Sequence, residues 1–567
     1  MSNVSQYLAK VMQCRDGMDS RGLLVALYEI DRKFYNGLLP TDAVGQAQRA
    51  DCFNTIERLF GGDGTSVCAS PLVIPPAYWL EWPLPPANAA SFVWASLQVL
   101  SVCVKEHILS GKDHFFDRVE SPISGDAYLL VLRRDSPWAS ASARYFKPGD
   151  FRLAELHIVP EQEKFQKAFH RLPYDLESRM SAAIQQVPPP GEPYSVPVAR
   201  MAVWPVHKDL LFAVRHASHP QAIAPEQPEA GHYLPFCLED GNEMPVWDEQ
   251  AAHFQQHVLP GCQNERILVL LLPELAVPPR FLALLQEAMR AHFDAEKEEA
   301  RQMGWLDAPP CYPVLMVAGS FHMLNGTNPL QAVNRTVVLN YRGEEVLFDS
   351  NAIGREDLVP WSMEKLVRYE IHRSQLPDEA TELIGALGLD DAGVACAVEP
   401  GVVGTVLPIV YAGSRLGLMT TAICIDFIDP AGLQPWLGQF QGKGWVDWVF
   451  VPSATPETEA FENTSKAWGK KGVCTVVVNA CWLLDRAKKW ARASFAMAGI
   501  PLGAPTARAS RQQRNKRYAR WRHGGTEATG FSLRPLLSDA SGSCTLSCGE
   551  CLAILDVELD DVSQRAG

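Results

Sequence analysis

Reactive side chains stand at the ends of two apolar runs in this sequence. Glu274 follows the run 270–273 (Leu-Leu-Leu-Pro), and Cys424 directly follows the run 416–423. A carboxylate at the end of a buried strand has a raised pKa, which makes it a better base near neutral pH. A thiol at a strand-to-turn junction becomes a strong nucleophile when a neighbouring base takes its proton. Each residue alone has an ordinary alternative, a solvent-facing glutamate or a core cysteine.

A third candidate is Lys365, in the helix-like segment 361–366, and it is the only lysine between Lys297 and Lys443. An ammonium near a reacting carbonyl or nitrile stabilises the negative charge that develops there. The ordinary alternative is a solvated surface lysine. An acid, Asp426, follows Cys424 by two residues.

The elements around these residues alternate between strands and helices, which predicts a layered α/β domain. Open α/β sheets bind ligands at strand ends, where Glu274 and Cys424 are expected. Before this region, helices are expected from about residue 5 to 60 and again from about residue 90. A short strand is expected at 127–133, followed by mixed helix to about residue 186. The run Pro188–Gly191 is the expected boundary, because consecutive prolines prevent helix continuation. The sequence therefore predicts a mostly α-helical domain of unknown role at 1–190 and an α/β domain at 191–567. Strands are expected at 198–203, 267–272, 314–318, 335–340, 346–348, 417–424, 448–452, 474–480 and 551–557, and helices at 247–258, 280–301 and 463–471.

The order of glutamate, lysine and cysteine resembles the catalytic triad of the nitrilase superfamily of carbon–nitrogen hydrolases. The resemblance covers roughly residues 195–560 and includes the segments 319–320, 334–338, 343–347, 447–453, 462–479 and 551–557. It implies an α-β-β-α sandwich of four layers. Two departures are an additional segment at 350–362 before the lysine and a long proline-rich region at 205–245.

The resemblance also implies a mechanism, in which a covalent thioester or thioimidate forms on Cys424. Glu274 would act as the base and Lys365 would hold the developing negative charge, helped by a backbone N–H after Cys424. Glu370 would be the additional glutamate that many family members place near the lysine. The implied enzyme cleaves a non-peptide carbon–nitrogen bond of a small amide or nitrile, needs no cofactor or metal, and forms a homodimer.

The alternative is an effector or partner-binding module that keeps the nitrilase fold. Nitrilase-like domains occur attached to reverse transcriptases in bacterial antiphage defence systems, and a large helical extension is reminiscent of them. The chain has no Tyr-x-Asp-Asp polymerase motif, so a polymerase would be a separate protein. A papain-like cysteine hydrolase is disfavoured, because no histidine has a comparable strand-end context.

The remaining signals concern location and partners. The chain has 567 residues, a net charge of −14, no apparent signal peptide or membrane span, and 14 scattered cysteines, which together predict a cytoplasmic protein. The spacing of Cys544, Cys548 and Cys551 is compatible with part of a metal site, but structural thiols are the expected reading. A basic segment predicts either a solvated loop or a contact with nucleic acid or another polyanion. Its residues are Arg508, Arg511, Arg514, Lys516, Arg517, Arg520 and Arg522.

Overall fold

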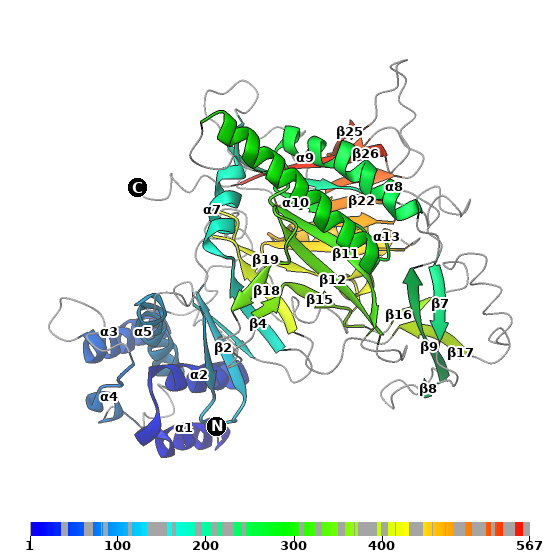
Figure 1. Cartoon of the computed structure of the whole chain (residues 1–567). Helices are drawn as coiled ribbons and strands as arrows, with labels where there is room; N and C mark the ends of the chain where they lie inside the picture. The colour runs from blue at the N-terminus through cyan, green and yellow to red at the C-terminus, as the bar shows by residue number, and fades with distance from the viewer. Residues whose placement is uncertain are drawn as a thin grey trace. The chain divides into compact units, whose positions relative to one another are not determined.

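The chain divides into two compact units in the computed structural model (Figure 1). The first comprises residues 1–134 and 146–166, and the second comprises residues 135–145 and 167–567. The structure describes residues 2–35, 43–61, 72–80, 82, 89–110, 116–132, 156–160, 166–187, 196–206, 212–216, 221–222, 232–240, 245–304, 311–324, 332–349, 358–367, 369–371, 394–398, 406–413, 415–429, 446–455, 458–470, 472–480, 494–501, 518–522, 528–536 and 550–559.

The first unit is mostly helical, as predicted, and also contains a small antiparallel sheet that includes the predicted strand at 127–133. Its helices are α1 (Ser2–Gln13), α2 (Ser20–Ile30), α3 (Ala43–Gly61), α4 (Pro76–Leu80) and α5 (Ala89–Ser110), and its strands β1 (Phe116–Glu120), β2 (Ala127–Leu132) and β3 (Leu156–Pro160) pair in that order. The side chain of Asp19 caps α2 by accepting the backbone N–H groups of Arg21 and Gly22. Apolar faces of α2, α3 and α5 pack with β2 and β3 in one core. The helices therefore have a sheet to pack against within their own unit.

The division between the units falls before the predicted boundary at residue 190. Three elements from the expected helical domain belong to the second unit: β4 (Gln166–Arg171) lies at the edge of a sheet beside β18, α7 (Tyr174–Ala183) follows it, and β5 (Gln185–Val187) pairs with β6. The buried face of α7, which includes Leu176 and Met180, packs into the core of the second unit. The prediction of helix up to about residue 186 missed the strands β3 and β4. Residues 188–191 themselves lie outside the described residues.

The first large sheet of the second unit has the order β15-β12-β11-β10-β6-β26-β25. Strands β6, β10 and β11 are parallel, and the other pairs are antiparallel. The bounds are β6 (Val196–Val203), β10 (Val269–Leu271), β11 (Leu315–Leu324), β12 (Ala332–Asn340), β15 (Ser362–Glu364), β25 (Ser532–Pro535) and β26 (Cys551–Glu558).

The second large sheet has the order β24-β23-β22-β21-β20-β19-β18-β4. Its centre, β19-β20-β21, is parallel, fully buried and mainly apolar. Strands that are covered on both faces have apolar side chains at successive positions, without the polar alternation of a half-exposed strand. The bounds are β18 (Val406–Tyr411), β19 (Leu418–Thr421), β20 (Trp448–Ser453), β21 (Cys474–Asn479), β22 (Ser494–Gly499), β23 (Tyr518–Arg522) and β24 (Ala528–Thr529).

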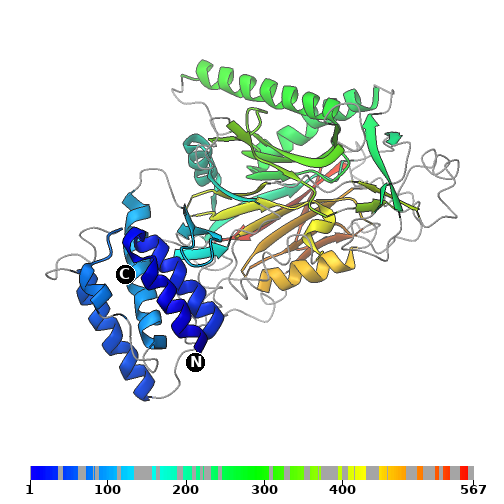
Figure 2. The same cartoon turned by 90° about the horizontal axis from the view of Figure 1, so that it is seen from below.

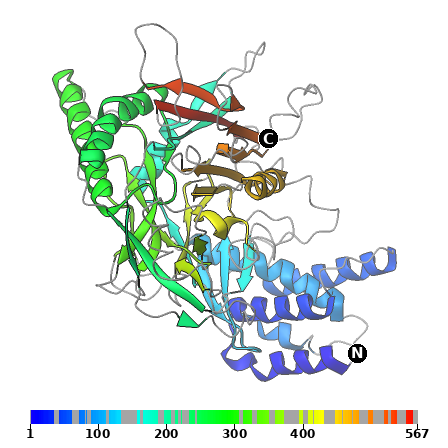
Figure 3. The same ribbon diagram turned by 90° about the vertical axis from the view of Figure 1, so that its right-hand side faces the viewer.

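Helices cover the outer faces of the two sheets, and the inner faces share one core. The shared core includes Val269, Val317, Phe450 and Val476. Helices α8 (Pro245–His253), α9 (Leu259–Glu265) and α10 (Pro279–Gln302) pack on the outer face of the first sheet, and α13 (Glu459–Lys470) packs on β21 and β22. Figures 2 and 3 show α10 and α13 on opposite sides of the sheets. The predicted α-β-β-α sandwich is therefore confirmed.

Smaller elements accompany the sandwich. Strands β13 (Leu347–Asp349) and β14 (Leu358–Pro360) form a ribbon. A separate sheet has the order β16-β17-β9-β7, with β8 (Gln221–Ala222) paired to β9. Its strands are β7 (Phe212–His216), β9 (His232–Asp240), β16 (Tyr369–Ile371) and β17 (Val394–Val398). Among the described residues, no helix has the length and apolar character needed to span a membrane.

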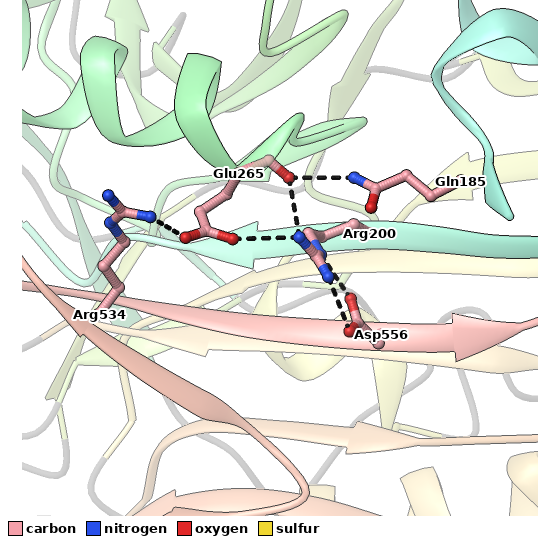
Figure 4. A network of polar contacts seen from close by, with 5 residues as sticks. All are labelled: Gln185, Arg200, Glu265, Arg534 and Asp556. Carbon is pink, nitrogen blue, oxygen red and sulfur yellow. Dashed lines mark hydrogen bonds and ion pairs between the residues drawn. The ribbon is translucent and has the colours of Figure 1, made fainter. Parts of the chain in front are cut away.

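A partly exposed ion-pair network, which we call the β6 network, links the strands β5, β6, β25 and β26 to the end of α9 (Figure 4). Arg200 on β6 donates through Nε to Asp556 Oδ1 at 2.6 Å and through Nη1 to Glu265 Oε2 at 3.0 Å. Arg534 also pairs with Glu265, and the Gln185 amide donates to the Glu265 carbonyl. The network joins four strands and one helix end.

Candidate active site

Glu274 lies just after β10, where the backbone leaves the first sheet. It forms an isolated bridge with Ser320 on β11, and the Leu275 N–H donates to the Ser320 carbonyl at 2.7 Å. The backbones of these two segments approach closely here, since a Cβ at Gly319 would lie 2.2 Å from the Pro273 carbonyl oxygen. Gly319 also has a φ of 68°, so this position favours glycine on both counts. The strand end therefore fixes the backbone of Glu274, whose side chain is buried.

Lys365 directly follows β15, so the helix-like interpretation of its segment is wrong. The segment is extended because β15 pairs with the edge of β12, where Met363 lies opposite Thr336 and is fully buried. The Lys365 N–H donates to the Asn334 carbonyl at 2.8 Å, which extends this pairing to the lysine itself. Lys365 is 1% exposed, and its Nζ lies 2.5 Å from Glu274 Oε1. The surface-lysine alternative is therefore excluded.

Three donors from different parts of the chain orient the Glu274 carboxylate. Lys365 Nζ and Asn334 Nδ2 both donate to Oε1, the latter at 2.7 Å, and the Ala454 N–H donates to Oε2 at 3.1 Å. Bonds of a charged acceptor with several donors are strong and directional. The sequence contained no signal for the roles of Asn334 and Ala454, which lie 60 and 180 residues from Glu274.

Cys424 begins a short 3-10 turn, Cys424–Phe427, shortly after the end of β19 at Thr421, as its strand-end position predicts. Its φ of 48° is left-handed, a strained conformation for a residue with a side chain. Strain of this kind clusters at functional sites, where the surrounding structure maintains it. The Ser453 hydroxyl donates to the Cys424 sulfur at 3.5 Å, and the Ala454 N–H that binds Glu274 also lies against this thiol.

The buried charges favour a protonated thiol beside a formed ion pair. Burial raises the pKa of Cys424 to about 12, the Glu274 carboxylate contributes in the same direction, and Lys365 opposes it. Burial lowers the pKa of Lys365, but Glu274, Cys424 and Asp426 outweigh it and the net shift is upward. Cys424 therefore needs a base to become a nucleophile, and Glu274 is the carboxylate that the structure brings beside it.

Two further polar side chains flank this carboxylate. Asn334 Oδ1 and Ser320 Oγ are buried and have no hydrogen-bond partner within the described part of the chain. His322 on β11 lies opposite Asn334 on β12. Burial and, to a smaller extent, the charge of Lys365 lower the pKa of His322 to about 3. The Asn334 amide oxygen and the Ser320 hydroxyl are therefore available to a polar ligand next to Glu274.

The fourth predicted site residue, Glu370, lies on β16 in the separate sheet, opposite Ala397 of β17. Its side chain lies outside the described residues. The catalytic role of Glu370 stays a prediction.

The predicted polyanion and metal signals fall largely outside the described residues. Arg520 and Arg522 lie on β23, where Arg520 is 3.9 Å from Glu462, while Arg508, Arg511, Arg514, Lys516 and Arg517 are not described. Cys551 is buried on β26, while Cys544 and Cys548 are not described. Within the described ranges, no cluster of three or more His, Cys, Asp or Glu side chains is arranged to hold a metal ion.

No family model matches the chain, and no curated protein matches it. Among solved structures, an amidase from Nesterenkonia sp. is 14% identical with a TM-score of 0.27, over 65% of this chain and 92% of the amidase. The C. elegans NitFhit protein is 12% identical with a TM-score of 0.31, over 64% of this chain and 61% of NitFhit. A mutant of the Nesterenkonia sp. AN1 amidase, "showing covalent addition of the acetamide moiety of fluoroacetamide at the active site cysteine", is 14% identical with a TM-score of 0.26, over 64% of this chain and 90% of that one.

These TM-scores are low, and the fold is defined by the topology of the chain itself. Two sheets with parallel centres face each other, helices cover both outer faces, and Glu274, Lys365 and Cys424 are buried where strands of both sheets end. The second unit therefore has the α-β-β-α sandwich fold that the resemblance to the nitrilase superfamily implies.

Proposed function

We propose that the second unit is a carbon–nitrogen hydrolase of the amidase or nitrilase type, with Cys424 as its nucleophile. The observation that supports this most strongly is the fully buried ion pair between Lys365 and Glu274 next to a buried thiol. Buried ion pairs are costly to desolvate and contribute little net stability. The position of this pair beside the strained turn at Cys424 therefore supports a catalytic role for it.

In the first half-reaction, Glu274 takes the proton of Cys424 while the sulfur attacks the carbonyl carbon of an amide. The Lys365 ammonium, with a backbone N–H near Cys424, stabilises the oxyanion. Glu274 then returns the proton to the leaving nitrogen, the carbon–nitrogen bond breaks, and a thioester remains on Cys424. A nitrile would form a thioimidate instead.

In the second half-reaction, Glu274 removes a proton from water, which attacks the thioester carbon. The carbon–sulfur bond breaks, the sulfur regains its proton from Glu274, and a carboxylic acid leaves. The hydrogen bonds from Lys365, Asn334 and Ala454 keep the Glu274 carboxylate in one orientation for both proton transfers. Asn334 Oδ1 and Ser320 Oγ would accept the N–H groups of an amide substrate.

The test is ammonia release from a panel of small aliphatic and aromatic amides and nitriles. Cys424→Ala should abolish release. The matched control is Cys262→Ala, which removes another fully buried thiol with a strongly raised pKa, on α9 rather than at the site. Equal loss in both variants would contradict a nucleophilic role for Cys424. A wild-type protein inactive on the whole panel would favour the partner-binding module instead.

The remaining expectations stay predictions: a role for Glu370, pairing of two copies, a cytoplasmic location, a polyanion contact through the basic segment, and a place in antiphage defence beside a separate reverse transcriptase.

A further inference from the structure

Asp426, which the proposed mechanism does not use, joins the nucleophile turn to the lysine segment. It lies two residues after Cys424 in the same 3-10 turn and is fully buried. Its Oδ2 accepts the Leu366 N–H at 2.9 Å, and its Oδ1 accepts the Val367 N–H at 2.8 Å. Both carboxylate oxygens are therefore bonded to the backbone directly after Lys365.

The backbone of Lys365 is consequently held on both sides. Before the side chain, the Lys365 N–H binds the Asn334 carbonyl on β12. After it, the two N–H groups bind Asp426. Since β15 ends at Glu364, no strand within the described residues pairs with the backbone at Leu366 and Val367. Asp426 takes the place of a neighbouring strand there.

We propose that Asp426 is a positioning residue that holds Lys365 in register with Cys424 by binding the backbone on the far side of the lysine. The inference rests on the proposed function, because it matters only if Lys365 and Cys424 act together. An ionised carboxylate suits the role, since in that form both its oxygens accept and neither carries a proton. An asparagine would turn an NH₂ group toward one of the two N–H donors.

Charge supports the same role. Glu274 and Asp426 both raise the pKa of Lys365, and the contribution of Asp426 remains when Glu274 takes up the proton of Cys424 and becomes neutral. Burial in turn raises the pKa of Asp426 to about 7, opposed first by the charge of Lys365 and then by the two N–H donors. Asp426 and Lys365 thus stabilise each other's charged forms.

The first experiment measures the rate of Cys424 alkylation by iodoacetamide in the full chain, with each site resolved by mass spectrometry. Asp426→Asn should slow alkylation roughly 10- to 100-fold, because a small displacement of a catalytic group has an effect of this size. The matched control is Asp447→Asn, which alters another buried carboxylate that accepts a backbone N–H, that of Leu418 at the start of β19. Asp447→Asn should leave the Cys424 rate unchanged.

A double-mutant cycle separates positioning from a general structural role. In a Lys365→Met background, Asp426→Asn should have no further effect on the alkylation rate, because Asp426 acts through Lys365. An equal slowing in both backgrounds would overturn the proposal. So would a normal rate in Asp426→Asn, provided that Lys365→Met and Glu274→Gln are slow. If those two variants are also normal, the proposed function fails as well.

If Asp426→Asn does not fold, hydrogen exchange of the wild-type protein tests the same link. The amides of Leu366 and Val367 should open together with the turn Cys424–Phe427, because one carboxylate joins them. Exchange of the lysine segment at a clearly faster rate than the turn would overturn the proposal.

Discussion

The same strand, β10, has an ion-pair system at each of its ends, and the two systems differ mainly in their contact with water. Glu265, just before β10, belongs to the β6 network, whose side chains are 19% (Arg200), 24% (Glu265), 37% (Arg534) and 48% (Asp556) exposed. Glu274, just after β10, pairs with Lys365, and these two side chains are 0% and 1% exposed. Both systems pair carboxylates with basic side chains, so we attribute the difference between them to burial.

Water screens the β6 network, so its charges are cheap to form and each pair contributes little. The buried pair loses its hydration and depends on its partners, so removing one of them leaves an uncompensated charge. The low-polarity surroundings also strengthen every electrostatic interaction with a reacting group. The comparison supports a holding role for the β6 network and the chemical role that we propose for the buried pair.

The largest expected effect comes from Lys365→Met, which leaves the Glu274 carboxylate buried without its cation. The free energy of unfolding should fall by about 3–5 kcal/mol, as for other broken buried ion pairs. Urea denaturation measures the loss. The double variant Glu274→Gln/Lys365→Met should regain part of this stability, because neither charge then remains. A loss in Lys365→Met as small as that of a surface lysine would remove the contrast between the two systems.

An intermediate effect is expected from acid, through His322 beside the buried pair. The unfolded imidazole binds a proton near pH 6.5, whereas the folded one does so only at about 3. The unfolded chain therefore gains protons first, and stability present above pH 6.5 is lost as the pH falls toward 3, by about 1 kcal/mol between pH 6 and 5. His322→Asn should lose less stability than the wild type over this interval in acid urea titrations. The raised pKa of Asp426 makes stability increase as the pH falls from about 7 to 3.8, which is the opposite trend. This contribution is the same in the wild type and in His322→Asn, so it cancels when the two proteins are compared. Identical slopes would mean that His322 is hydrated.

The smallest effect is expected at the β6 network. Arg534→Ala should destabilise the protein by about 0.5 kcal/mol, because exposed pairs are screened and its partner Glu265 keeps Arg200. The difference from wild type should shrink further in urea denaturation at high salt. A loss of several kcal/mol that salt does not weaken would show that exposure fails to distinguish the two systems.

The nine predicted strands of the second unit are confirmed, with shifted ends, because most are apolar runs in the buried centres of the sheets. Strands at the margins were missed. In β23 the sequence Tyr-Ala-Arg-Trp-Arg alternates buried and partly exposed residues, and its arginines made it part of the predicted basic segment. The alternation belongs to a strand with only one face in the core.

At the site, local sequence predicted where Glu274 and Cys424 stand but not what orients them. Strand ends can be read from apolar runs. The orienting hydrogen bonds of Asn334, Ala454 and Asp426 join residues that are at least 59 positions apart. A local sequence pattern does not predict which distant segments contact each other. Lys365 was predicted by its isolation among the lysines and by the family resemblance, although its surroundings were read as helix.

The central claim, that Glu274 serves as base for Cys424, is tested most directly by the pH dependence of Cys424 alkylation with iodoacetamide in the wild type and Glu274→Gln. If Glu274 acts as the base for a thiol whose pKa burial raises to about 12, the wild-type rate should be nearly constant between pH 6 and 8. The rate of Glu274→Gln should be roughly 100-fold lower at pH 7, because general-base assistance has this size. It should rise tenfold per pH unit, as for a thiol that depends on hydroxide. Equal rates and equal slopes in the two proteins would contradict the account.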